Sequence, residues 1–135
     1  MVGNTLDYGT ADRTADMNAA KAAGIDAFAL NIAYSEEANA LVNLAFSIAT
    51  SVGFKLFFSF DYAGNGFWPN DNVISLINAW KGYDAYYKRG SQPLASTFEG
   101  SGAADQWATI KSATGCFFVP DYSSLMRVLL IFSVL

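Results

Sequence analysis

Three carboxylates each close a short apolar run in this chain of 135 residues: Asp61 ends KLFFSFD, Glu99 ends LASTFE and Asp121 ends CFFVPD. A buried parallel strand is apolar along its length because both of its faces are covered, so chemistry can enter only at its end. In barrel-type α/β enzymes, the carboxyl ends of the strands form the active-site face. We therefore expect the three carboxylates to meet at one cleft, as general acid, general base or acceptors for sugar hydroxyls. The alternative for each is a helix N-cap or a loop acceptor.

Aromatic rings accompany these acids. Tyr62 and Tyr122 follow two of them directly, and Trp68 stands in the loop after Asp61. A flat ring beside carboxylates suits a pyranose, which has an apolar face and a hydroxyl rim; packing in a core is the alternative. Asn31, at the end of a fourth apolar run, could bind a hydroxyl or simply close its strand. The predicted substrate-binding residues are Asn31, Asp61, Tyr62, Trp68, Glu99, Asp121 and Tyr122.

The chain contains no histidine and a single cysteine, Cys116. Without histidine, Ser-His-Asp and Cys-His catalysis and the usual zinc sites are excluded, which leaves acid–base chemistry to carboxylates. The net charge of −4 argues against nucleic acid as a partner, because such proteins present a basic face. We expect no metal site, and we expect Cys116 to pack as a small hydrophobic residue.

The composition is unusual for a small domain. Apolar residues make up 53% of the chain and charged residues only 15%, which excludes disorder. Small domains expose much of their surface, so this low charge indicates a part of a larger protein.

The two ends differ from the middle. Residues 1–4 lack the basic start and apolar run of a signal peptide. Residues 125–135 are strongly apolar but too few to span a bilayer as a helix, so we expect no membrane insertion. We divide the chain into a barrel segment over 1–124 and an apolar tail over 125–135.

Between these ends, apolar runs alternate with helix-like stretches. Repeated β-α units imply a parallel sheet with right-handed crossovers. Polar strand ends recur and no phosphate-binding glycine motif is present, which favours the first five units of a (β/α)8 TIM barrel over an open sheet. We predict helices over 10–23, 35–52, 71–80 and 103–113, and strands at 1–2, 25–32, 54–60, 94–98 and 116–120, with Thr10 or Asp12 and Asn70 or Asp71 as N-caps.

Several segments, in order, resemble glycoside hydrolase family 71, the fungal α-1,3-glucanases also called mutanases. They are MVGNT, AGIDAFALNI, GFKLFFSFDYAG, STFEG and IKSATGCFFVPDY. The resemblance covers roughly residues 1–124. It implies a (β/α)8 catalytic barrel, hydrolysis of α-1,3-glucan with inversion, no cofactor, and an extracellular or cell-wall location.

The chain also departs from the family pattern. An Ala-His-Phe lead and a signal peptide do not precede Met1, and residues 125–135 do not resemble the family. The later Trp-Asn-Asp-x-Gly-Glu motif, to which the resemblance assigns the acid and the base, does not occur in this sequence. We therefore expect an inactive hydrolase fragment, with Asp61, Glu99 and Asp121 at the substrate. The alternatives are a non-catalytic glucan-binding half-barrel and a small open-sheet protein that binds a nucleotide.

Overall fold

The computed structural model describes residues 7–35 and 39–124. The predicted strand at residues 1–2 and the tail at 125–135 lie outside these ranges. The elements are α1 (Thr10–Ala22), β1 (Ala27–Ala33), α2 (Asn39–Val52), β2 (Lys55–Asp61), α3 (Asn70–Trp80), β3 (Lys88–Arg89), β4 (Gln92–Phe98), the 3-10 helix η2 (Ser101–Ala103), α4 (Gln106–Thr114) and β5 (Phe117–Val119).

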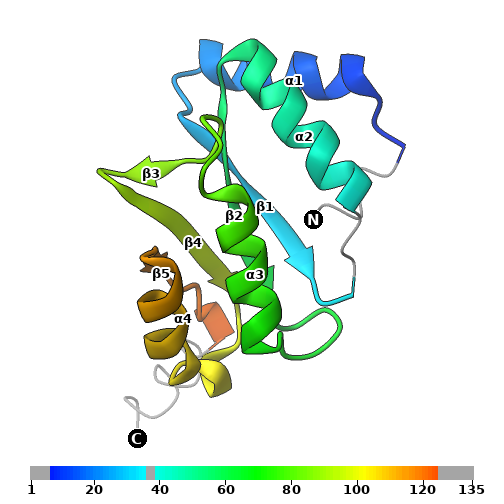
Figure 1. Cartoon of the computed structure of the whole chain (residues 1–135). Helices are drawn as coiled ribbons and strands as arrows, with labels where there is room; N and C mark the ends of the chain where they lie inside the picture. The colour runs from blue at the N-terminus through cyan, green and yellow to red at the C-terminus, as the bar shows by residue number, and fades with distance from the viewer. Residues whose placement is uncertain (1–6, 36–38, 125–135) are drawn as a thin grey trace, which may run out of the picture.

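The sheet is parallel except for one short strand. β1, β2, β4 and β5 are hydrogen-bonded neighbours in that order, and all three of these pairings are parallel. The two-residue β3, which the sequence pattern did not predict, pairs antiparallel with β4. Helices separate the parallel strands along the chain (Figure 1). The predicted α/β class with a parallel sheet is therefore confirmed.

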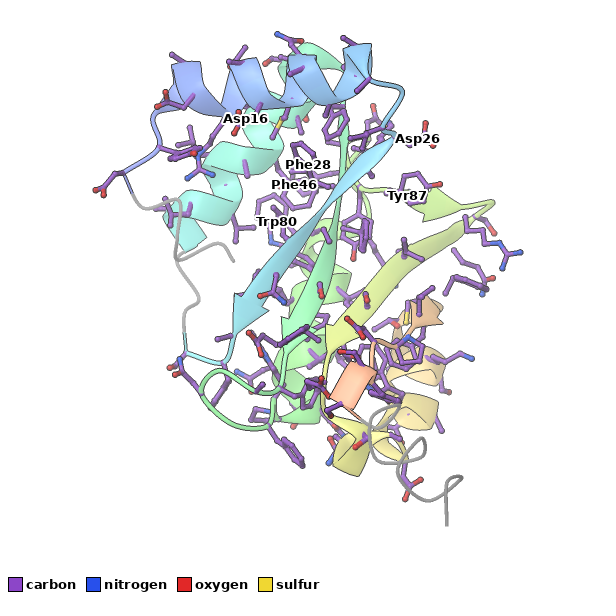
Figure 2. The ribbon with its side chains drawn as sticks, turned by 180° about the vertical axis from the view of Figure 1, so that it is seen from behind. Asp16, Asp26, Phe28, Phe46, Trp80 and Tyr87 are labelled. Carbon is purple, nitrogen blue, oxygen red and sulfur yellow. The ribbon has the colours of Figure 1, made fainter. Side chains whose placement is uncertain are left out.

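Helices α2, α3 and α4 lie on one face of this sheet, and α1 packs on α2. In Figure 1, α2, α3 and α4 lie in front of the strands, and in Figure 2, turned by 180°, β1, β2 and β4 lie in front of the helices. The core fills the space between the two layers. Phe58 of β2 contacts Phe46 of α2 with ring centroids 5.8 Å apart, and Phe60 contacts Trp68 at 5.1 Å and Trp107 at 6.1 Å.

Alternate residues along each strand point to the opposite face of the sheet. We call this the open face, because no described helix covers it in either view. An arrangement with α2, α3 and α4 on one side of the sheet only is compatible with part of a barrel. The open face carries Asn31 of β1, Phe57 and Ser59 of β2, and Ser96 and Phe98 of β4.

The predicted N-cap of α1 was wrong. The cap is Gly9, not Thr10 or Asp12, and its backbone N–H donates to the Asp12 carboxylate at 3.0 Å. Asp12 thus occupies the third helical position, where an acid can reach back to the cap.

The predicted N-cap of α3 was also wrong, because Pro69 occupies that position. Its φ of −63° lies in the narrow range that the proline ring allows. Asn70 and Asp71 are therefore the first helical residues rather than caps, and Asp71 remains well placed for the positive end of the helix dipole.

The core confirms the packing prediction for Cys116. Cys116 is buried with 1% of its surface exposed. Trp107 stacks on Phe118 with ring centroids 3.7 Å apart and planes 6° apart, which is a structural role. Within residues 7–35 and 39–124, no helix is long and apolar enough to cross a membrane.

Candidate functional site

The backbone brings the three predicted carboxylates to one edge of the sheet. Asp61 is the last residue of β2 and is aligned with Phe98, the last residue of β4. The N–H of Tyr62 donates to the carbonyl oxygen of Phe98 at 3.0 Å, and the N–H of Glu99 donates to the carbonyl oxygen of Asp121 at 2.8 Å. Parallel strands end on the same side, so the three positions are neighbours.

The Asp61 side chain shapes the loop that follows β2. It is 3% exposed, and its Oδ1 accepts the N–H groups of Ala63 at 2.8 Å and Gly64 at 2.9 Å. The loop also lies close to β1, because a Cβ added at Gly64 would be 2.8 Å from the Cβ of Ala33. One oxygen of Asp61 therefore accepts hydrogen bonds from the loop backbone. This is the loop-acceptor role that was given as the alternative for this residue.

Glu99 is held by two serines that follow β5. Its Oε1 accepts the Ser123 hydroxyl at 3.1 Å and the Ser124 N–H at 3.0 Å, and its Oε2 accepts the Ser124 hydroxyl. The Ser124 hydroxyl is the largest of the influences that lower the pKa of Glu99 below its ordinary value. The carboxylate is therefore held ionised, as an acceptor.

Asp121 belongs to the same turn. Its Oδ1 accepts the N–H of Ser123 at 3.1 Å, and its own N–H donates to the Thr97 hydroxyl at 3.4 Å. Asp121 is exposed, whereas Thr97 is 2% exposed. The segment after β5 is thus joined to β4 by the backbone of Glu99, by its side chain and by Thr97.

A row of polar side chains crosses the open face, two residues before the last residue of each of β1, β2 and β4. The strand register aligns Asn31 of β1 with Ser59 of β2, and Ser59 with Ser96 of β4. Asn31 was predicted from the sequence as a substrate-binding residue, whereas both serines were missed. Each serine interrupts an apolar strand two residues before its last residue, and this was the signal that could have found them.

The predicted aromatic residues differ in exposure. Tyr62 is 3% exposed and Trp68 is 1% exposed, so both rings belong mainly to the core. Tyr122 is half-buried. The rings exposed at the carboxyl ends of the strands are those of Phe67 and Phe98, at 54% and 41%. Neither was among the predicted substrate-binding residues.

In the ranges 7–35 and 39–124, no group of three or more histidine, cysteine, aspartate or glutamate side chains could hold a metal ion. The site therefore consists of carboxylates, hydroxyls, one amide and aromatic rings.

Comparison with known proteins identifies the family. The model of glycosyl hydrolase family 71 matches residues 1–131. A mutanase of Penicillium rubens is 33% identical over 118 residues, which cover 84% of this chain and 25% of the relative. The chain thus spans about a quarter of the length of this relative. The chain belongs to glycosyl hydrolase family 71.

Proposed function

We propose that this chain forms part of the barrel of an α-1,3-glucan hydrolase and that its strand ends bind the glucan. The observation that carries the proposal is the alignment of Asp61, Glu99 and Asp121 along one edge of the parallel sheet. The family match and the mutanase relative support the substrate class. The parallel order β1-β2-β4-β5 with helices on one face is compatible with the first part of a (β/α)8 barrel. The family match gives no support to the nucleotide-binding alternative.

The described carboxylates are better suited to binding than to proton transfer. An inverting glycosidase needs a protonated carboxyl with a raised pKa and a carboxylate base, about 6.5–9.5 Å apart. Hydrogen bonds from serine lower the pKa of Glu99, which opposes protonation. One oxygen of Asp61 already accepts two backbone N–H groups. We assign these residues to substrate positioning and expect the acid–base pair to come from outside the described residues.

The open face continues this binding surface. Asn31 and Ser96 are half-buried and can exchange hydrogen bonds with hydroxyls, while the exposed Phe98 ring offers a flat apolar surface to the C–H face of a sugar. This combination suits an uncharged polysaccharide. We propose that the polymer is α-1,3-glucan of microbial cell walls, which would place the action of the protein outside the cell.

Retention on polymer and hydrolysis can be measured in one experiment. Purified chain is incubated with insoluble α-1,3-glucan, and both the bound protein and the released reducing ends are followed. We expect retention without release. Turnover would contradict the assignment of these residues to positioning alone, and loss of retention would contradict glucan binding. Insoluble β-1,3-glucan serves as the control polymer.

Variants then locate the binding surface. Phe98→Ala and Ser96→Ala should reduce retention on α-1,3-glucan. Tyr83→Ala is the matched control, because Tyr83 is also an exposed ring, at 50%, and lies after α3 on the helix side of the sheet. If all three variants bind equally, the open face is not the binding surface.

A further inference from the structure

A shallow, largely open cavity of about 420 Å³ lies where α3 and α4 begin, apart from the open face. Both helices start at the same end of the molecule, near the carboxyl ends of the strands, and they pack side by side (Figure 1). The cavity is lined by Phe67, Trp68, Pro69, Asn70, Asp71 and Gln106.

Three of these residues carry a buried polar atom without a hydrogen-bond partner among the described residues. These atoms are the indole Nε1 of Trp68, the Oδ1 of Asn70 and the Oε1 of Gln106. Trp68 is 1% exposed. Buried polar atoms are nearly always paired, because an unpaired one costs roughly 1–3 kcal/mol. All three residues line the same cavity, and a partner from outside the chain would reach these buried atoms once the side chains around them shift.

The atoms show what this partner must offer. The indole N–H can only donate, and the two amide oxygens can only accept, so the partner needs both acceptors and donors. Hydroxyl groups supply both. The one charged side chain of the lining is Asp71, a carboxylate that would disfavour an anion.

The rim of the cavity supplies an apolar surface. Phe67 is 54% exposed. The ring lies against the turn before α4, because a Cβ added at Gly102 would be 3.2 Å from its Cζ. An exposed and positioned ring next to hydroxyl partners is suited to a pyranose, which presents C–H groups on its face and hydroxyls on its rim.

We propose that this cavity is a second glucan-binding site, which takes a glucosyl residue on the helix side of the strand ends. The choice of glucose as the ligand rests on the proposed function; the need for a hydroxyl-bearing ligand does not. Trp68 then serves this second site rather than the open face. A polymer held at both places would be fixed in direction across the rim of the sheet.

The indole N–H signals of the labelled full chain test the proposal. The chain has three tryptophans, Trp68, Trp80 and Trp107, so the ¹⁵N indole region is simple. Titration with an α-1,3-linked glucose disaccharide should move the Trp68 signal in a saturable manner. Phe67→Ala and Gln106→Ala should each weaken this binding by about 2–13-fold, the loss of one contact of net 0.5–1.5 kcal/mol. Tyr83→Ala should leave it unchanged.

Other outcomes overturn the inference. If the amides of Glu99 and Ser124 respond to the disaccharide and the Trp68 indole does not, the second site is refuted and the proposed function stands. If the Trp68 indole responds equally to glycerol at the same concentration, the cavity is an adventitious hydroxyl site. If no signal responds and the polymer retains no protein, both proposals fail. Dispersed amide spectra of each variant verify that it is folded.

Discussion

The backbone N–H of Glu99 donates to the carbonyl oxygen of Asp121 at 2.8 Å, while the Glu99 carboxylate binds Ser123 and Ser124 just beyond. Glu99 has a φ of 59°, in the left-handed region that non-glycine residues seldom adopt. Such a conformation persists where surrounding contacts hold it. The end of β4 is thus fixed to the segment after β5 at the place where the glucan is proposed to bind.

The titration of Glu99 should report the serine contacts. Its carboxyl should titrate below the ordinary glutamate range, because hydrogen bonds from Ser124 and Ser123 stabilise the ionised form. A pKa lowered by folding stabilises the fold above the unfolded-state pKa, and this stabilisation is lost as the pH falls through the lowered value. Carbon-13 NMR of the side-chain carboxyl measures the midpoint. Ser124→Ala should raise it, and an ordinary midpoint in the unmodified chain would contradict the contact.

Replacement of Gly100 should be strongly destabilising. Gly100 has a φ of 87°, and a Cβ there would be 2.5 Å from the Cγ of the buried Tyr62. Gly90 has a φ of 62° and no heavy atom within 4 Å of the added Cβ, so it isolates the backbone strain. We expect Gly90→Ala to lower the free energy of unfolding by about 1–2 kcal/mol, and Gly100→Ala by about 3 kcal/mol or more, because overpacking is added. Urea denaturation measures the free energy of unfolding of both variants. Equal losses would show that the Tyr62 ring moves aside without an energetic cost.

Asp61 should control the loop after β2. Asp61→Ala removes the acceptor of the Ala63 and Gly64 N–H groups, whereas Asp61→Asn keeps an oxygen at that position. We expect the alanine variant to lose about 1–3 kcal/mol of stability and the asparagine variant less. Hydrogen exchange gives the local readout. The two amides should lose protection in the alanine variant only, and unchanged protection there would contradict the loop-acceptor role.

The Tyr62 hydroxyl should ionise at a higher pH than an ordinary tyrosine. Burial is the largest influence and raises the pKa of Tyr62 to about 12, with a further contribution from Tyr122. Because the folded-state pKa lies above the ordinary value of about 10, the stabilisation is complete below pH 10 and is lost as the pH rises toward 12. Absorbance titration near 295 nm should show a late component that Tyr62→Phe removes. A loss of amplitude near pH 10 in that variant, with the late component unchanged, would show that Tyr62 ionises like an exposed tyrosine.

Local patterns were sufficient to predict much of the fold. The helical spacing over residues 10–23 and the apolar runs before Asp61 and after Pro93 produced elements within a few residues of those observed. The cap positions were predicted wrongly because a polar capping side chain was expected, whereas the observed caps, Gly9 and Pro69, make no side-chain cap hydrogen bond. The short β3 was missed because a two-residue strand has no periodicity of its own.

The sequence by itself determined the order of the α-helices and of the parallel strands, the carboxylates that follow these strands, and the family, because apolar periodicity and motifs depend on neighbouring residues. Only the tertiary structure decided which side chains serve together. The sheet register aligns Asn31 with Ser59 and Ser59 with Ser96, and the packing of α3 on α4 brings Asn70 and Gln106 to one cavity. Such pairings depend on the free energy of the whole packed layer, which no local segment of the chain specifies.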